Sequence, residues 1–175
     1  MRIFIASSGE RLNMAIEVGS WLEGMNVEPV LWNEPEVFPL GAYTWDALID
    51  LSENVDAAIF IFGEDDQIWF RGESTMTVRD NVLLEYGLFS GKLSKANTIF
   101  LCDGRPKLAS DLEGITWGDI RKKNSVRIKL ENWINSIRAS NQKKVKGFKI
   151  TDLNDAFQIA LKNQKTEKLR IFAIS

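Results

Sequence analysis

Short apolar runs rich in β-branched residues alternate with longer segments of helical periodicity along most of this chain. Four runs have the character of strands: residues 2–6 (RIFIA), 27–31 (VEPVL), 57–62 (AAIFIF) and 98–101 (TIFL). Apolar side chains recur close to a 3.6-residue period in four other segments: residues 11–25, 44–53, 81–93 and 125–137. Three of these runs, RIFIA, AAIFIF and TIFL, are apolar nearly throughout, as expected of parallel strands buried on both faces. The alternation predicts an α/β fold with a doubly wound, flavodoxin-like parallel sheet.

The expected ligand site follows from this fold. In an open parallel sheet, ligands bind outside the carboxyl ends of the strands. Four loops are expected at those ends: residues 7–10, 32–43, 63–78 and 102–117. We therefore expect the pocket to be built from these loops and from the helix starts beside them.

The chain has no histidine and a single cysteine, Cys102. These absences exclude Ser-His and Cys-His catalysis and the usual Cys/His zinc sites, so no metal is expected. Cys102 follows an apolar run, and we interpret it as a small buried residue rather than a nucleophile. If the protein is an enzyme, then carboxylates, Arg, Tyr, Ser or Lys must perform its chemistry. No apolar run approaches the ~18 residues that span a bilayer, and the N-terminus lacks signal-peptide features, which indicates a cytoplasmic protein.

Charge is divided unevenly along the chain. Residues 1–120 carry 8 basic and 20 acidic side chains, whereas residues 121–149 carry 10 basic and 1 acidic side chain. A basic block of this kind could bind nucleic acid or an acidic partner surface. Because no aromatic platform is interleaved with the lysines of this block near Trp133, we favour a solvated helix face over a nucleic-acid site.

Two loops carry polar side chains that could contact a ligand. Residues 7–10 (SSGE) could hold a phosphate or ribose, although Ser7 or Ser8 could equally serve as a helix N-cap. Asp65 and Asp66 follow a buried strand, where adjacent carboxylates could bind a divalent metal. Such a pair is more often a turn signal, and a substrate contact by one of the two is a further possibility.

The segment 79–87 (RDNVLLEYG) is the third candidate. If a helix begins near Asp80, Asn81 and Glu85 stand at i and i+4 on one face, with Arg79 at the entrance. Glu85 is then a carboxylate on a largely apolar helix, although glutamates in the middle of a helix are as often solvent-facing. Gly87 and Gly91 suggest close packing of this helix against a neighbouring element or chain.

At these residues the sequence resembles the TIR-like domains of bacterial cyclic-nucleotide defence systems, the CBASS and Pycsar effector group. The likeness covers roughly residues 2–120 and includes RIFIASS, EPVLWNEPEVFPLGAYTWDALID and VDAAIFIFGEDD in the same order. Its most specific stretch is VRDNVLLEYGLFSGKLSKANTIFLC, which matches the family pattern R-x-N-V-x-x-E-x-G-x-F-x-G-x-L. A minor departure is Ala109, close to where the family often has proline.

The resemblance implies cleavage of the bond between nicotinamide and ribose in NAD+, with NAD+ as substrate and no cofactor. The family's required glutamate corresponds to Glu85. The other expected substrate-binding residues are Ser7, Trp32, Phe38, Asp65, Arg79 and Asn81. Arg79 would contact the diphosphate or fix the loop before the helix, Asn81 would orient Glu85 or a ribose hydroxyl, and Trp32 and Phe38 would stack on a base.

The resemblance also implies activation by self-association through TIR–TIR contacts, driven by a domain that senses a cyclic nucleotide. We expect residues 1–145 to form the TIR domain. Residues 146–175 are expected to hold a linker with a helix (152–162) and a strand (169–174), either an extension of this domain or the start of a sensor domain. The competing functions are a non-catalytic assembly and signalling module and a nucleoside-processing enzyme of related fold.

Overall fold

The computed structural model describes residues 1–35, 37, 44–112, 115 and 117–147, with side chains as far as residue 142. Its elements in chain order are β1 (Arg2–Ser7), η1 (Gly9–Arg11), α1 (Leu12–Glu23), β2 (Glu28–Leu31), α2 (Thr44–Glu53), β3 (Ala57–Gly63), β4 (Asp66–Phe70), β5 (Glu73–Thr77), α3 (Asp80–Leu93), β6 (Thr98–Asp103), η2 (Ser110–Leu112), β7 (Gly118–Asp119) and α4 (Lys123–Gly147). Phe38 and the helix and strand expected after residue 150 lie outside the described residues.

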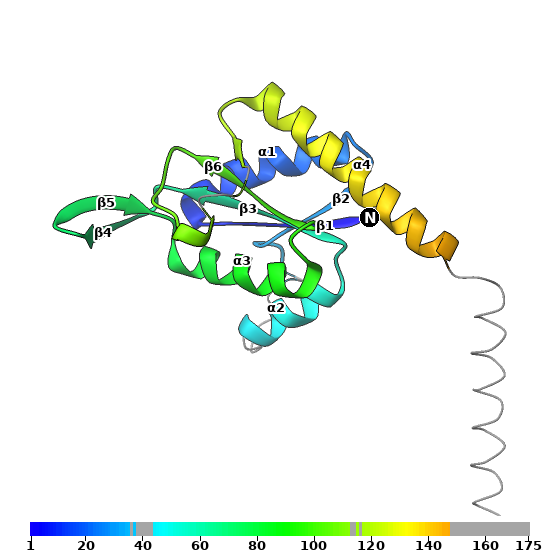
Figure 1. Ribbon diagram of the computed structural model, residues 1–175, viewed down its shortest axis with the longest axis horizontal. Coiled ribbons are helices and arrows are strands. Elements are labelled where there is room, and N and C mark those ends of the chain that lie inside the picture. The colour runs from blue at the N-terminus through cyan, green and yellow to red at the C-terminus, as the bar shows by residue number, and fades with distance from the viewer. Residues whose placement is uncertain (36, 38–43, 113–114, 116, 148–175) are drawn as a thin grey trace, which may run out of the picture. The chain divides into compact units, whose positions relative to one another are not determined.

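Five parallel strands form the central sheet in the order β2-β1-β3-β6-β7. The helices α2 and α3 cover one face, and α1 and the first part of α4 cover the other (Figure 1). The predicted doubly wound α/β fold is therefore confirmed. The chain divides into two compact units, residues 1–133 and 134–175, and the described part of the second unit is the remainder of α4.

The core beneath α3 is mostly aromatic. Phe4 and Phe89 stack with ring centroids 4.9 Å apart, and Phe62 and Phe100 stack at 4.7 Å. Tyr86 meets the edges of Phe60, Phe62 and Phe100 at 5.5–5.6 Å. Such edge-to-face pairs are favoured geometries that add about 0.5–1.5 kcal/mol each beyond area burial. Tyr86 thus fixes the rotation of α3 about its own axis.

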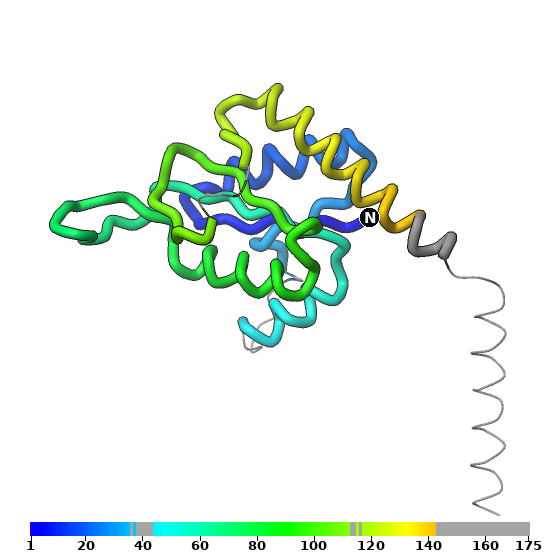
Figure 2. Tube along the Cα trace, in the orientation of Figure 1, coloured from blue at the N-terminus to red at the C-terminus, as the bar shows by residue number. Residues whose placement is uncertain are grey.

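One expected loop has regular structure. Residues 63–78 contain an antiparallel hairpin of β4 and β5, which pairs Asp66 with Thr77 and Phe70 with Glu73. Its two-residue turn, Arg71-Gly72, has φ of 50° and 89°, the left-handed conformation that a tight hairpin turn requires. The chain runs from β3 out into this hairpin and back into α3 (Figure 2). The segment was expected to be a loop, and the hairpin within it was not predicted.

Two further differences concern helix ends. Ser8 occupies the N-cap position of η1, one of the two positions expected, although its side chain makes no capping hydrogen bond. The helix expected over 125–137 extends from Lys123 to Gly147. Periodicity stopped at Ile137 because the following residues are polar, yet they include no proline and no glycine before Gly147 that would end a helix. Cys102 is buried, as predicted. No helix in the described ranges is long and apolar enough to cross a membrane.

Candidate functional site

Polar side chains gather where β1, β2, β3 and β6 end, at the sheet edge where the site was expected. Ser7 is the last residue of β1, Trp32 follows β2, Asp65 follows β3, and Asp103 ends β6. Because α3 runs back antiparallel to the strands, its first turns start at the same edge. The fold therefore places Arg79, Asn81 and Glu85 on the side of the sheet where ligands of such folds bind.

Ser7 and Trp32, both predicted from the sequence, are in direct contact. The indole nitrogen of Trp32 donates a hydrogen bond of 2.9 Å to Oγ of Ser7. Oγ of Ser7 in turn donates to the carbonyl oxygen of Ser8, also at 2.9 Å. Ser7 is buried and Trp32 is partly buried against the core beneath α3. This chain of bonds fixes the start of the loop that follows β2.

Asp65 and Asp66 form ion pairs with two different arginines. Asp65, with its side chain 1% exposed, lies 3.3 Å from Nε of Arg11, whose Nη1 lies 3.3 Å from Asp103. Burial raises the pKa of Asp65, opposed by the Ser8 hydroxyl and the Arg11 guanidinium. The adjacent Asp66 pairs with Arg79 instead. Among the described residues, no group of three or more potential metal ligands is present.

Arg79 links three elements at the entrance to α3. Its Nη2 lies 3.0 Å from Glu10 of η1 and 3.0 Å from Asp66 of β4. Hydrogen bonding to Asp66 and Glu10 raises the pKa of Arg79. The pKa of Glu10 is lowered, first by a backbone hydrogen bond and then by its contact with Arg79. Of the two roles considered for Arg79, this geometry performs the second, fixing the segment before the helix.

Glu85 lies one residue before Tyr86, on the flank of the buried side of α3. Val82, Tyr86 and Phe89 form that buried side, and Glu85 is partly buried beside them. Burial alone raises the pKa of Glu85 to about 7 from its ordinary value of 4.5. Within the described part of the chain, no ion pair or hydrogen bond to this carboxylate is found. An unpaired carboxylate in an apolar setting is the pattern typical of functional sites.

Asn81 is exposed at the first turn of α3, where its backbone N–H donates a hydrogen bond of 2.7 Å to the carboxylate of Asp80. It forms no bond with Glu85 in the described structure, so its expected orienting role stays a prediction. Gly87 and Gly91 are exposed, and a Cβ added to either would meet no atom within 4 Å. The expected close packing of these glycines against a neighbouring element does not occur within the described chain.

Sequence reasoning missed Arg11 and Asp103 as members of the site, and it gave Glu10 of the candidate loop 7–10 no role of its own. Arg11 was included in the amphipathic segment that begins at its position, and Asp103 in a loop. The available signal was charge placement, because three acidic residues and one arginine lie at, or within four residues of, the ends of strands that meet at one edge. Burying such charges requires partners, which predicts that the arginine lies among the acids.

The fold is that of a TIR-type domain. The TIR domain of the Toll-related receptor TRR-2 from Hydra magnipapillata superposes with a TM-score of 0.58 at 14% identity, covering 78% of this chain and 97% of that domain. Residues 2–122 match the model of the TIR domain of CAP12/Pycsar effector proteins. The chain belongs to this family of CAP12/Pycsar effector TIR domains.

Two relatives illustrate the extent of the likeness. CD-NTase-associated protein 12 of Sphingobacterium faecium is 34% identical over 137 residues, covering 78% of this chain and 42% of that protein. Pycsar effector protein PaPycTIR of Pseudomonas aeruginosa is 37% identical over 117 residues, covering 65% of this chain and 37% of that protein. The chain thus spans about two fifths of the length of these relatives.

Proposed function

We propose that this domain cleaves NAD+ between nicotinamide and ribose, and that Glu85 is the catalytic carboxylate. The observation that carries the proposal is the burial of Glu85 without a counter-ion, on a helix that starts at the ligand-binding edge of the sheet. Membership of the CAP12/Pycsar effector family supports a role in anti-phage defence within the cytoplasm.

The chemistry suits a site without histidine. The carbon–nitrogen bond between ribose and nicotinamide breaks, and its electron pair stays on the ring nitrogen, so nicotinamide leaves as a neutral molecule. The ribosyl group becomes an oxocarbenium-like cation, as in glycoside cleavage. Water adds to that cation and loses a proton, giving ADP-ribose. The leaving group needs no general acid, so one well-placed anion is sufficient.

The apolar setting of Glu85 determines what this anion contributes. A fixed negative charge in a site of low dielectric stabilises a developing cation far more than the same charge in water does. The same setting disfavours the ionised carboxylate when the site is empty, which is why its pKa is near 7. The positive nicotinamide ring of NAD+ would favour the ionised form, so substrate binding would prepare the catalyst.

The remaining predicted residues fall into two groups. Trp32 and Ser7 form one bonded unit at the ends of β1 and β2, which we assign to the ribose or base of the substrate. Arg79 and Asp65 are held by ion pairs, and we assign them to shaping the edge rather than to the reaction. The names of the relatives support activation by a nucleotide signal, which we assign to a sensor domain of the whole protein, with self-association of TIR domains as the active state.

The experiment is nicotinamide release from NAD+ by concentrated or crowded protein, comparing the wild type with Glu85→Gln. The matched control is Glu23→Gln, which makes the same change on the exposed surface of α1. We expect Glu85→Gln to lower the rate by about 100-fold or more and the control to keep it. Equal rates in both variants would overturn the assignment of Glu85.

Two other results would favour the competing functions. Assembly without nicotinamide release under any crowding condition would favour a non-catalytic signalling module. Cleavage of free nucleosides but not of NAD+, in the same assay, would favour a nucleoside-processing enzyme.

A further inference from the structure

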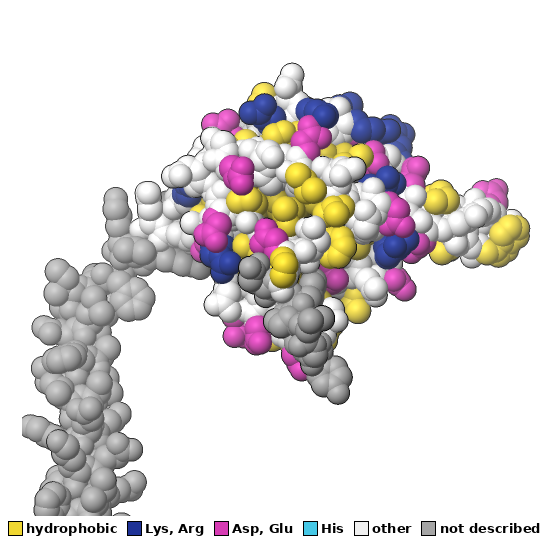
Figure 3. Space-filling view, turned by 180° about the vertical axis from the view of Figure 1, so that it is seen from behind, with side chains coloured by type: hydrophobic (Ala, Val, Ile, Leu, Met, Phe, Trp, Pro, Cys, Tyr) yellow, Lys and Arg dark blue, Asp and Glu magenta, His cyan; other side chains and the backbone are white. Residues whose placement is uncertain are grey.

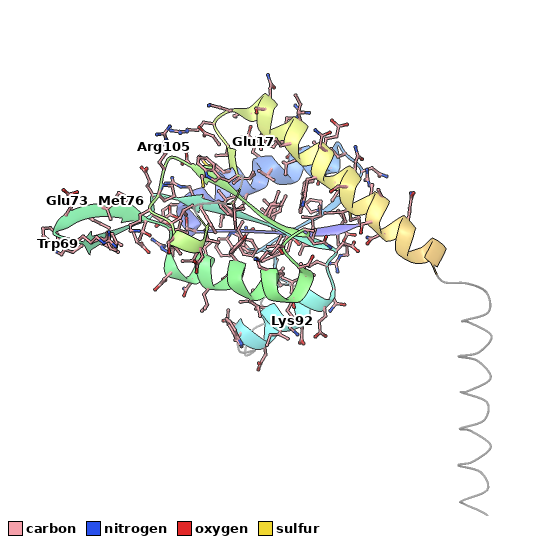
Figure 4. The ribbon with its side chains drawn as sticks, viewed as in Figure 1. Glu17, Trp69, Glu73, Met76, Lys92 and Arg105 are labelled. Carbon is pink, nitrogen blue, oxygen red and sulfur yellow. The ribbon has the colours of Figure 1, made fainter. Side chains whose placement is uncertain are left out.

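The hairpin of β4 and β5 is an apolar projection from the domain. Its hydrophobic side chains are exposed to an unusual degree, with Trp69 76%, Phe70 39%, Ile68 38% and Met76 38% exposed. Figure 3 shows hydrophobic side chains gathered at the hairpin end, away from the body of the domain. Trp69, Glu73 and Met76 lie along this projection (Figure 4). Burying large apolar side chains is favourable, so exposed clusters of this kind mark interaction surfaces.

The hairpin is held firmly at its base. The Lys107 backbone N–H donates a hydrogen bond of 2.8 Å to the carbonyl of Met76. The Thr77 hydroxyl donates a hydrogen bond of 2.9 Å to the carbonyl of Lys107. The Lys107 ammonium lies 4.2 Å from the ring centroid of Phe70, a cation–π contact. Arg79 secures the first residue of β4 through Asp66. Trp69 is therefore presented on a supported arm, which lowers the entropy that binding would remove.

A second feature of the same domain is an apolar hollow. A hollow of about 310 Å³ opens between β6, the segment before β7 and α4. Its apolar lining is made of Ile99, Phe100, Leu101, Trp117, Leu130 and Trp133. Lys129 and Asn132 also line it, and both are exposed. The volume accommodates one bulky aromatic side chain in a largely apolar setting.

The charges around the two features are complementary between copies. The hairpin rises from the edge that holds the acidic side chains of Glu64, Asp65 and Asp103, the last two paired with Arg11. The hollow lies beside the start of α4, where the basic residues are Lys122, Lys123, Arg127 and Lys129. Within the first unit, residues 1–120 carry a net charge of −12 and residues 121–133 carry +4. A second copy approaching with its basic face toward this acidic edge would be attracted and oriented.

We propose that the hairpin of one copy docks into this hollow of the next, with Trp69 as the buried anchor. The two surfaces are different parts of the chain, so the contact is head-to-tail. Each docked copy still offers a free hairpin or a free hollow, and such contacts grow into open filaments unless the rotation closes a ring. The proposal deepens the self-association assigned under the proposed function by naming its two surfaces, and its test by mass does not depend on NAD+ cleavage.

The first test is sedimentation of the whole chain over a concentration series up to about 1 mM, a range that detects weak contacts. The wild type is expected to form oligomers that lengthen with concentration. Trp69→Ala is expected to weaken the association about 30-fold or more, as for an aromatic anchor. Ile16→Ala, at an apolar side chain of α1 that is 45% exposed, is the control expected to assemble normally. A wild type that stays monomeric, or a Trp69→Ala variant that assembles normally, overturns the proposal.

The second test blocks the other half of the contact. Asn132→Arg places a long side chain over the mouth of the hollow and is expected to prevent assembly. Asn124→Arg adds the same charge at an exposed position of α4 outside the hollow, and it should assemble normally. Equal assembly by the two variants would show that hairpins pair with something else, such as each other, and would overturn the proposal.

A mixture of the two defective copies separates a head-to-tail contact from a symmetric one. Trp69→Ala retains its hollow, and Asn132→Arg retains its hairpin, so their mixture should form one-to-one pairs that grow no further. Failure to form such pairs would contradict the proposal. Because the readout is mass, normal assembly with no nicotinamide release would disprove the proposed NAD+ cleavage and leave this contact standing.

Discussion

The indole nitrogen of Trp32 and the hydroxyl oxygen of Ser7 are joined by a 2.9 Å hydrogen bond across 25 positions of sequence. The bond ties the last residue of β1 to the first residue after β2. The Ser7 hydroxyl thus accepts a hydrogen bond from Trp32 and donates one to the carbonyl of Ser8. The start of the loop after β2 is therefore fixed by the side chain of its first residue.

Trp32→Phe is expected to lower the free energy of unfolding by about 0.5–1.5 kcal/mol, the net contribution of one such bond. The phenyl ring keeps most of the packing but offers Ser7 no donor. Urea denaturation at low protein concentration measures the change. Trp69→Phe, at a position 76% exposed, is the control and should leave the unfolding free energy unchanged. Equal effects at both positions would contradict the structural role of the bond.

Glu85→Gln is expected to stabilise the protein at pH 8. Folding raises the pKa of Glu85 from 4.5 to about 7, so the folded protein holds this proton more tightly than the unfolded chain does. The free energy of unfolding therefore falls as pH rises through this range, and the penalty is complete above it. Removing the charge should recover about 1–3 kcal/mol at pH 8.

The measurement is thermal or urea unfolding of both proteins at several pH values. The advantage of Glu85→Gln should shrink as pH falls and vanish below about pH 4.5. At such a pH Glu85 is protonated in the folded and in the unfolded protein alike. A pH-independent difference would mean that the substitution acts through packing rather than through charge.

The proposed reaction should itself depend on pH. Only ionised Glu85 stabilises a cation, so kcat/KM for nicotinamide release, which reports the free enzyme, should rise with pH and level off above about 7. Because bound NAD+ favours the ionised form, the rise in kcat should occur at lower pH. Stopped assays across pH 5–9 (about the range in which proteins of this kind stay folded) measure both profiles. A flat profile for kcat/KM would contradict the buried state of the carboxylate.

Gly63→Ala should disrupt the ion pairs that Arg11 makes at the strand ends. A Cβ added to Gly63 would collide with the guanidinium of Arg11 and lie 2.8 Å from Asp65. Displacing this buried network is expected to lower the free energy of unfolding by about 1–3 kcal/mol. The control is Gly9→Ala in η1, where an added Cβ meets nothing within 4 Å. Chemical denaturation should show a loss for the first variant and little change for the second.

The sequence was informative wherever burial imposes a pattern. Strands β1, β3 and β6 are apolar because both of their faces are covered, so their positions and the fold class could be predicted. The hairpin was missed because its strands are mostly exposed and carry no buried alternation. Two runs of five residues around Arg71-Gly72 were nevertheless a signal for a two-residue hairpin turn. The strand β7 has two residues, too few to form any pattern.

The site was predictable in location more than in detail. Ser7, Trp32 and Asp65 were correctly predicted to lie at this edge of the sheet. Each follows or ends a strand, and the topology of a parallel sheet alone brings such strand ends together. Periodicity could not tell whether Glu85 faces solvent, since it lies at the flank of the apolar stripe. Its burial depends on how Tyr86 packs among Phe60, Phe62 and Phe100, and that is a property of the whole core.

The absence of histidine gives the raised pKa of Glu85 one more consequence. A chain without imidazoles has few groups that exchange protons near neutral pH, so the titration of this carboxylate stands out from the background. Any cation that settles beside it would expel its proton into the solvent. Occupancy of the site could then be followed in weakly buffered solution by the acid released, before any bond in the ligand is broken.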